Sequence, residues 1–172
     1  DEPMSLFGAA VAETKPSYEQ KAVITTAEKA AFWQKLQVTK TLVPMTFEVA
    51  GEIPNLSVAK AEFFFDNTNY ALTLEKEDEE QFYTYLSDER ARKALCDAKE
   101  LYKAALCHGK KLVGVEEDVA LAAYLYEPGE TNYGLTALVS RYLGGEGKSA
   151  AQVAELVPKL QAYLQERELT KL

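Results

Sequence analysis

Between Thr41 and Ala50, apolar side chains alternate with other residues, and this pattern constrains the fold more than any other in the chain. The positions that share one side of an extended segment are all apolar: Val43, Met45, Phe47 and Val49. The pattern predicts a strand over residues 41–50 with one face against a core. Pro44 has no backbone N–H for a neighbouring strand, so we expect a bulge there or a strand that begins at Met45.

The segment before this strand predicts a strand and a helix. Residues 22–24 predict a short strand, and Thr25 lies three residues before Glu28, which is the spacing of a capping box. A helix that begins there would carry three apolar residues on one face: Ala30, Trp33 and Leu36.

The rest of the chain changes from strands to helices. Extended or apolar segments are expected over residues 56–65, 70–74, 93–97 and 111–115, with a turn over residues 66–69. Helices are expected over residues 77–86, 98–108, 116–126, 133–143 and 149–168, and Ser87 is expected to cap one more, with Asp88 and Glu89 in its first turn. This order predicts an α/β fold in which helices flank one mixed sheet.

Composition and charge exclude several classes of protein. The chain has 172 residues, the size of one ordinary domain, and a net charge of −8 that opposes strong binding to phosphate backbones. No apolar run approaches the roughly 20 residues that a membrane span needs. Two cysteines, Cys96 and Cys107, indicate a reducing compartment rather than a disulfide framework. We therefore expect a cytoplasmic monomer that contacts no membrane and binds DNA weakly or not at all by itself.

The first residues differ in composition from the remainder. Residues 1–20 mix Pro, Gly, Ala, Glu and Ser without periodicity, so we expect a flexible linker there and a domain over residues 21–172. Because the chain begins with Asp1 rather than Met, we expect it to be an excised piece of a longer protein.

Few residues carry a pattern typical of catalysis. His108, the single histidine, lies at the end of an expected helix, where a capping role is favoured over catalysis. Cys107 and His108 are adjacent on that helix and diverge by about 100°, so they do not form a nucleophile–base pair. The glycine-rich segment 144–147 follows a helix rather than a strand, and it predicts a loop rather than a phosphate site. Glu48 shares a strand face with Thr46 and could bind a metal, although a local partner is the simpler interpretation.

Three segments together resemble a known family of nucleases. They are ALCDAKELYK over residues 94–103, GVEEDVALAAYLYEP over residues 114–128 and YGLTALVSRYLG over residues 133–144. The segments are similar to the 3′–5′ exonuclease domain of bacterial DNA polymerase I, a family A polymerase, with the resemblance extending over about residues 20 to 172. The resemblance implies a ribonuclease H-like fold, with a mixed five-stranded sheet and flanking helices. Active members use two divalent metals to degrade single-stranded 3′ ends.

The same resemblance implies that the metal ligands are missing. The Asp-x-Glu motif of the family reads Thr46-Phe47-Glu48 here, and the second-motif Asp falls on Leu101. The third motif requires an Asp on a late helix, and the sequence contains no Asp after Asp118. We therefore expect no catalytic residue, no bound cofactor and no metal in this fragment, with Mg²⁺ serving only the parent polymerase.

The resulting hypothesis is a vestigial, inactive proofreading domain, similar to those in polymerase I of Gram-positive bacteria. It would support DNA synthesis in repair and replication as a spacer against the polymerase domain of its own chain, and it would reach DNA only through that parent. Two alternatives stay open. One is an active exonuclease with shifted ligands, such as Glu48 with Asp97 and Glu100. The other is a free-standing binding module that kept the fold.

Overall fold

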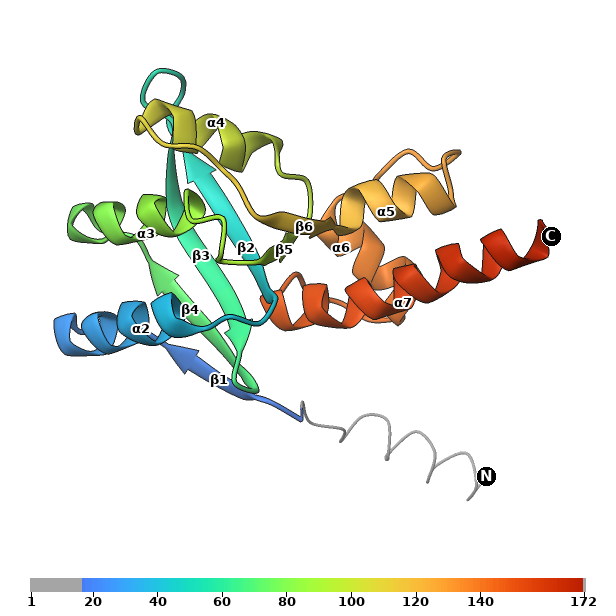
Figure 1. The fold of residues 1–172 in the computed structure, drawn as a ribbon, viewed down its shortest axis with the longest axis horizontal. Helices are drawn as coiled ribbons and strands as arrows, with labels where there is room; N and C mark the ends of the chain where they lie inside the picture. Colours follow the sequence, from blue (N-terminus) through green and yellow to red (C-terminus); the bar gives the residue numbers. More distant parts are fainter. Residues whose placement is uncertain (1–16, 172) are drawn as a thin grey trace.

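A mixed six-stranded sheet forms the centre of the molecule in the computed structural model, which describes residues 17–171 (Figure 1). The strands in chain order are β1 (Glu19–Ala22), β2 (Val43–Ala50), β3 (Ser57–Phe65), β4 (Thr68–Thr73), β5 (Lys93–Leu95) and β6 (Val115–Asp118). Their order across the sheet is β1-β4-β3-β2-β5-β6. The strands β2, β3 and β4 pair antiparallel, whereas β1 with β4, β2 with β5, and β5 with β6 pair parallel.

Helices cover both faces of this sheet. They are α2 (Thr26–Val38), the 3₁₀ turn η1 (Lys76–Asp78), α3 (Glu79–Leu86), α4 (Lys99–Cys107), α5 (Val119–Tyr126), α6 (Leu135–Leu138), the π-helical segment η2 (Val139–Leu143) and α7 (Ala150–Thr170). A first core cluster joins α2, α3 and α4 to the sheet residues Met45 and Phe63. A second cluster joins α5, α6, η2 and α7 around Ala94 of β5. The predicted α/β architecture, one mixed sheet with flanking helices, is therefore confirmed, with six strands rather than five.

The helix α2 begins as predicted but buries a different set of residues. Thr25 accepts a hydrogen bond from the N–H of Glu28, whose side chain accepts in return, so the capping box is confirmed. Ala30 is exposed, and the buried residues are Lys29, Phe32, Trp33 and Leu36. Lys29 is buried because Nζ donates to Asp78 Oδ2 at 2.6 Å, which pairs the charge.

Pro44 lies inside β2, so the expectation of a bulge there or a later start was wrong. The strand begins at Val43, and Pro44 pairs with Ala94 of β5 in the parallel ladder. The antiparallel register with β3 begins only at Met45, so the missing N–H removes no bond from that ladder. The register shift in β2 falls instead between Glu48 and Val49.

The turn between β3 and β4 is shorter than predicted. Only Asp66 and Asn67 form it, with φ of 55° and 51°, and Thr68 and Asn69 already belong to β4. Two central residues with positive φ match the tight hairpin turn that suits the twist of antiparallel strands.

Ser87 ends a helix rather than starting one. It is the C-cap residue of α3, and its hydroxyl donates to the carbonyl oxygen of Lys111 at 2.9 Å. The N–H of Val113 donates to the carbonyl oxygen of Leu86, also at 2.9 Å. These bonds hold the segment before β6 against the end of α3, and for this reason the strand expected over residues 111–115 begins only at Val115.

The expected linker over residues 1–20 lies mostly outside the described residues. Within them, β1 begins at Glu19, two residues before the predicted start of order at Lys21. No helix among residues 17–171 is long and apolar enough to cross a membrane.

Candidate functional site

Thr46 and Glu48 project from the same face of β2, as their spacing of two residues predicts. The antiparallel register places Thr46 opposite Glu62 and Glu48 opposite Lys60 on β3. Glu48, Lys60 and Glu62 line an open cavity of about 560 Å³ that also reaches Thr73 on β4. This polar face is the location at which the sequence predicts the degenerate nuclease motif.

The carboxylate of Glu62 is already bonded to protein groups. Its Oε1 atom accepts hydrogen bonds from the backbone N–H of Ala150 at 3.0 Å and from Asn69 Nδ2 at 3.1 Å. Asn69 Oδ1 in turn accepts from the N–H of Ala151 at 2.9 Å, and Asn69 is only 1% exposed. We call Glu62 and Asn69, together with these three bonds, the α7 clamp.

The α7 clamp satisfies backbone donors that a helix N-terminus otherwise leaves without intrahelical partners. Ser149 caps the same turn, since its hydroxyl accepts from the N–H of Gln152 at 3.2 Å. The negative charge of Glu62 also lies at the positive end of the helix dipole. The sequence does not predict this role, because the pairing of Glu62 with Asn69 and Ala150 depends on strand register and on the packing of α7.

Leu101 does not join Thr46 and Glu48. Its side chain is fully buried in the first core cluster, which contains Met45 and Phe63. Met45 alternates with Thr46 along β2, so Leu101 belongs to the opposite face of the sheet. The structure therefore brings together two of the three positions that the sequence predicts to be degenerate, and it places the third in an apolar core.

Asp97 and Glu100, the alternative acidic ligands, are both exposed. The N–H groups of Asp97 and Ala98 donate to the carboxylate of Asp118 at 2.8 and 3.1 Å, which fixes the loop before α4. Asp118 Oδ1 also accepts from the N–H of Ala120 at 3.0 Å and so caps α5. Asp118 therefore joins two segments through backbone donors.

The donor set of the polar face does not fit the two metal ions that active nucleases of this kind use. Two hard cations need several oxygen ligands between them, with carboxylates foremost. This face offers Glu48 and the Thr46 hydroxyl, while Glu62 is bonded within the α7 clamp. Among residues 17–171, no three His, Cys, Asp or Glu residues lie close enough to hold a metal ion.

His108 is the C-cap residue of α4, as predicted. Its ring stacks on Tyr83 with the centroids 3.9 Å apart, and Nε2 lies 3.1 Å from Ser57 Oγ. The hydroxyl of Tyr83 accepts from the N–H of Val58 at 3.0 Å. These contacts join α3, α4 and β3, and none of them involves Cys107.

Cys96 is partly buried and donates a weak hydrogen bond from Sγ to the carbonyl oxygen of Tyr133 at 3.4 Å. Burial raises the pKa of its thiol to about 12, so the thiol stays protonated and unreactive at neutral pH. The glycine-rich segment 144–147 ends a helix rather than forming a phosphate loop, because Gly144 is the C-cap residue of η2 with φ of 73°.

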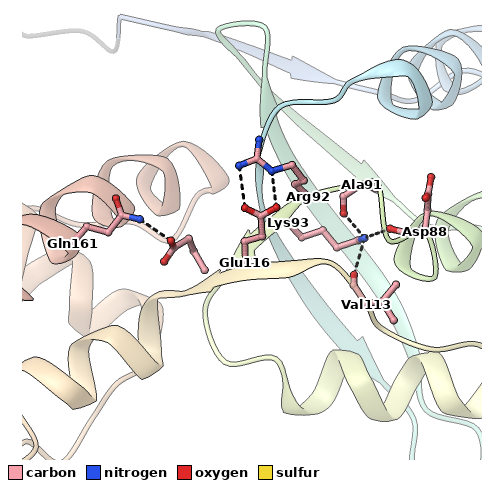
Figure 2. A network of polar contacts seen from close by, with 8 residues as sticks. Asp88, Ala91, Arg92, Lys93, Val113, Glu116 and Gln161 are labelled. Carbon is pink, nitrogen blue, oxygen red and sulfur yellow. Dashed lines mark hydrogen bonds and ion pairs between the residues drawn. The ribbon is translucent and has the colours of Figure 1, made fainter.

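A buried lysine on β5, beside the edge strand β6, was not predicted from the sequence. Lys93 on β5 is fully buried, and Nζ donates to the carbonyl oxygens of Asp88, Ala91 and Val113 at 3.0, 2.6 and 2.9 Å (Figure 2). The ammonium group also lies 4.8 Å from the centre of the Tyr85 ring. Desolvation lowers the pKa of Lys93 to about 8.

Two surface contacts beside Lys93 connect neighbouring elements (Figure 2). Arg92 forms a bidentate ion pair with Glu116 of β6, with N–O distances of 2.5 and 2.9 Å. The Arg92 guanidinium holds the pKa of the Glu116 carboxyl below its usual range. Gln161 of α7 donates to Glu117 at 2.6 Å. The edge strand β6 is therefore bonded both to the residue before β5 and to the helix α7.

Comparison with known proteins identifies the family. The family model that describes the ribonuclease H-like domain of DNA polymerase I matches residues 55–153. DNA polymerase I of Mycobacterium bovis is 39% identical over 74 residues, which cover 43% of this chain and 8% of the relative. This chain therefore matches only a small part of that relative's length.

Two solved structures share the fold. The structure of the POL domain of Pol1 from Mycobacterium smegmatis with DNA primer-template and dNTP has a TM-score of 0.69 and 25% identity, over 84% of this chain and 28% of that one. RNase D of Trypanosoma brucei has a TM-score of 0.58 and 16% identity, over 77% and 50% of the two chains, which shows the fold alone. The chain belongs to the ribonuclease H-like, 3′–5′ exonuclease-like domain family of DNA polymerase I.

Proposed function

We propose that this chain is a non-catalytic exonuclease-like domain of a bacterial DNA polymerase I, where it gives structural support to the polymerase domain. The observation that carries the proposal is the use of the polar face. Glu62, the carboxylate opposite Thr46, is bonded to the N-terminus of α7 and to Asn69. The late helix α7, on which the third motif would need its Asp, is held on the sheet by the hydrogen bonds of the α7 clamp.

The other degenerate positions support the same proposal. Thr46 offers a neutral hydroxyl where the family has a carboxylate, and Leu101 offers an apolar side chain in the core of the opposite face. A single remaining carboxylate, Glu48, would leave two cations short of ligands. An active exonuclease with shifted ligands would have to use Asp97 and Glu100, which do not form a three-carboxylate group with Glu48.

The proposal assigns DNA synthesis, its Mg²⁺ and its contacts with DNA to the parent polymerase. The net charge of −8 opposes phosphate binding by the domain itself. The monomeric state and the cytoplasmic location predicted from the sequence follow from the same assignment and remain part of the proposal. The free-standing binding module stays the competing hypothesis, and it is distinguished by the parent reading frame.

The test is a nuclease assay joined to a metal titration. The 172-residue chain is incubated with a 5′-labelled single strand and millimolar Mg²⁺ or Mn²⁺, with an active 3′–5′ exonuclease as positive control. We expect no shortening above the buffer blank and no saturable heat of Mn²⁺ binding by calorimetry. Metal-dependent shortening that Glu48→Ala abolishes would show instead that the domain is an active nuclease.

A further inference from the structure

The helix α5 has no charged side chain, and yet one of its faces is open to solvent. Its sequence is VALAAYLY, and Val119 and Ala123 are its buried residues. Leu121, Tyr124 and Leu125 are 57%, 51% and 56% exposed. Their spacing of three and four residues places them on one side of the helix, and we call this set the α5 apolar face.

A helix that is apolar all round is typically buried all round. In α5 the side toward α7 is covered, while the α5 apolar face is not. Isolated exposed leucines are common on proteins, but three large apolar side chains on two turns of one helix form a contiguous patch. Such a patch in a chain of net charge −8 indicates a surface that another protein surface covers.

The end of α7 lies beside this helix (Figure 1). Arg167 Nη1 donates to the carbonyl oxygen of Leu125 at 3.3 Å and to that of Tyr126, and its guanidinium lies 4.4 Å from the centre of the Tyr126 ring. Tyr126 also stacks on Tyr163 of α7, with the centroids 5.1 Å apart. In a chain that continues past α7, the next residues therefore emerge beside the C-terminal end of α5, which carries Leu125 of the α5 apolar face.

We propose that the α5 apolar face is the surface against which the polymerase domain of the parent chain packs, an inference that rests on the proposed function. The matching polymerase structure from M. smegmatis supports this occupant, because this chain corresponds to only 28% of it. A domain tethered beside the face has a high effective concentration there, so a modest apolar contact is sufficient to hold it.

The exposed apolar residues of α4 are a weaker candidate for the same role. Tyr102 and Leu106 are 49% and 51% exposed, and the adjoining groove is bordered by Lys99 and Lys103. No contact places the end of α7 beside this groove, because the described partners of Arg167 lie on α5. Leu106 therefore provides a matched control position.

The experiment uses the parent polymerase with the double substitution Leu121→Lys and Leu125→Lys. The control carries Val38→Lys and Leu106→Lys, which also place two lysines at apolar positions that are 67% and 51% exposed. Calorimetry follows the unfolding of the two domains, and limited trypsin digestion follows cleavage between them. A milder pair, Leu121→Gln and Leu125→Gln, keeps the test valid if the lysine variant fails to fold by circular dichroism.

We expect the α5 variants to separate the unfolding of the two domains and to speed cleavage between them about tenfold, which corresponds to about 1.4 kcal/mol of lost interaction. The control should behave as the unsubstituted enzyme. Coupled unfolding in both double variants would overturn this inference alone, and so would a concentration-dependent dimer of the 172-residue chain that only the α5 variants abolish. A parent reading frame without a polymerase domain would overturn the proposed function as well.

Discussion

Glu62 on β3 accepts a hydrogen bond at 3.0 Å from the backbone N–H of Ala150, the first residue of α7, although the two residues are 88 positions apart. This bond and the bonds of Asn69 attach the last helix to the central sheet. A pair of metal ions at this junction of strand and helix would need several carboxylates. The α7 clamp stabilises the junction with neutral amides and one carboxylate.

Substituting Glu62 should therefore loosen α7. We expect Glu62→Gln to lower the free energy of unfolding by about 1 kcal/mol, because it removes the charge at the helix N-terminus and keeps an acceptor. Glu62→Ala should cost more, about 1–3 kcal/mol, since the N–H of Ala150 and the amide of Asn69 both lose their acceptor. Urea unfolding measures both values.

The matched control for this comparison is Glu52→Gln, which changes the same charge at an exposed position in the β2–β3 loop. It should shift stability by no more than a few tenths of a kcal/mol, as surface substitutions usually do. Equal effects at Glu52 and Glu62 would show that the α7 clamp does not hold the helix.

Asp78 provides a second stability prediction. It is 2% exposed and accepts from Lys29 Nζ at 2.6 Å, from Trp33 Nε1 at 3.2 Å and from the N–H of Glu75 at 2.8 Å. We expect Asp78→Ala to cost about 3–5 kcal/mol, because it leaves the buried ammonium of Lys29 without its carboxylate.

The double variant Asp78→Leu with Lys29→Met should cost clearly less than Asp78→Ala, since it removes both buried charges together. Thermal unfolding of the three proteins checks the ranking. A double variant less stable than Asp78→Ala would show that the pair contributes through more than mutual neutralisation.

Lys93 makes stability depend on alkaline pH. Burial lowers its pKa in the folded chain to about 8, from an ordinary value of 10.5. Between these two values the unfolded chain binds more protons than the folded chain, so this group makes stability rise as pH rises through that range. The cost of the buried charge is fully present below about pH 8.

The comparison with Lys93→Met isolates this effect from other groups, including Asp88 and Tyr85 nearby. The variant keeps the length of the side chain but leaves the carbonyl oxygens of Asp88, Ala91 and Val113 without the ammonium. We expect the stability of the unsubstituted protein relative to the variant to increase from pH 8 to pH 10.5, the two pKa values involved. A flat or falling difference across that range, measured by urea unfolding, would mean that the three carbonyl bonds keep Lys93 charged.

The sequence predicted the elements that depend on local pattern and missed those that depend on distant contacts. The capping box of Thr25 and Glu28, the alternation in β2 and the helix expected over residues 149–168 all depend on local pattern, and the structure contains each of them. Ser87 was misplaced because its partner, Lys111, lies 24 residues away. No periodicity encodes such a contact.

The candidate site shows the same division. The shared face of Thr46 and Glu48 follows from the two-residue repeat of a strand, so the sequence predicted it. The opposition of Thr46 and Glu62 follows from a register that two strands and a turn set together. The distance of Leu101 from this face follows from the packing of α4 against the core, which one sequence position does not indicate.

The last prediction concerns an attempt to restore the nuclease. Thr46→Asp would add a carboxylate two residues from Glu48 and opposite Glu62, so three acidic groups would share one face of the sheet. We expect this variant to bind one Mn²⁺ weakly and to shorten no labelled single strand. A second cation would still lack ligands, because Leu101 lies on the opposite side of the sheet and Glu62 is bonded to Ala150 and Asn69. Adding Leu101→Asp should cost stability rather than restore activity, since it buries a charge in the apolar core. Calorimetry with Mn²⁺ and a strand-shortening assay check both variants, with Thr46→Asp plus Glu48→Ala as the control. Shortening by Thr46→Asp that this control abolishes would mean that the domain keeps the remaining ligands of an active nuclease.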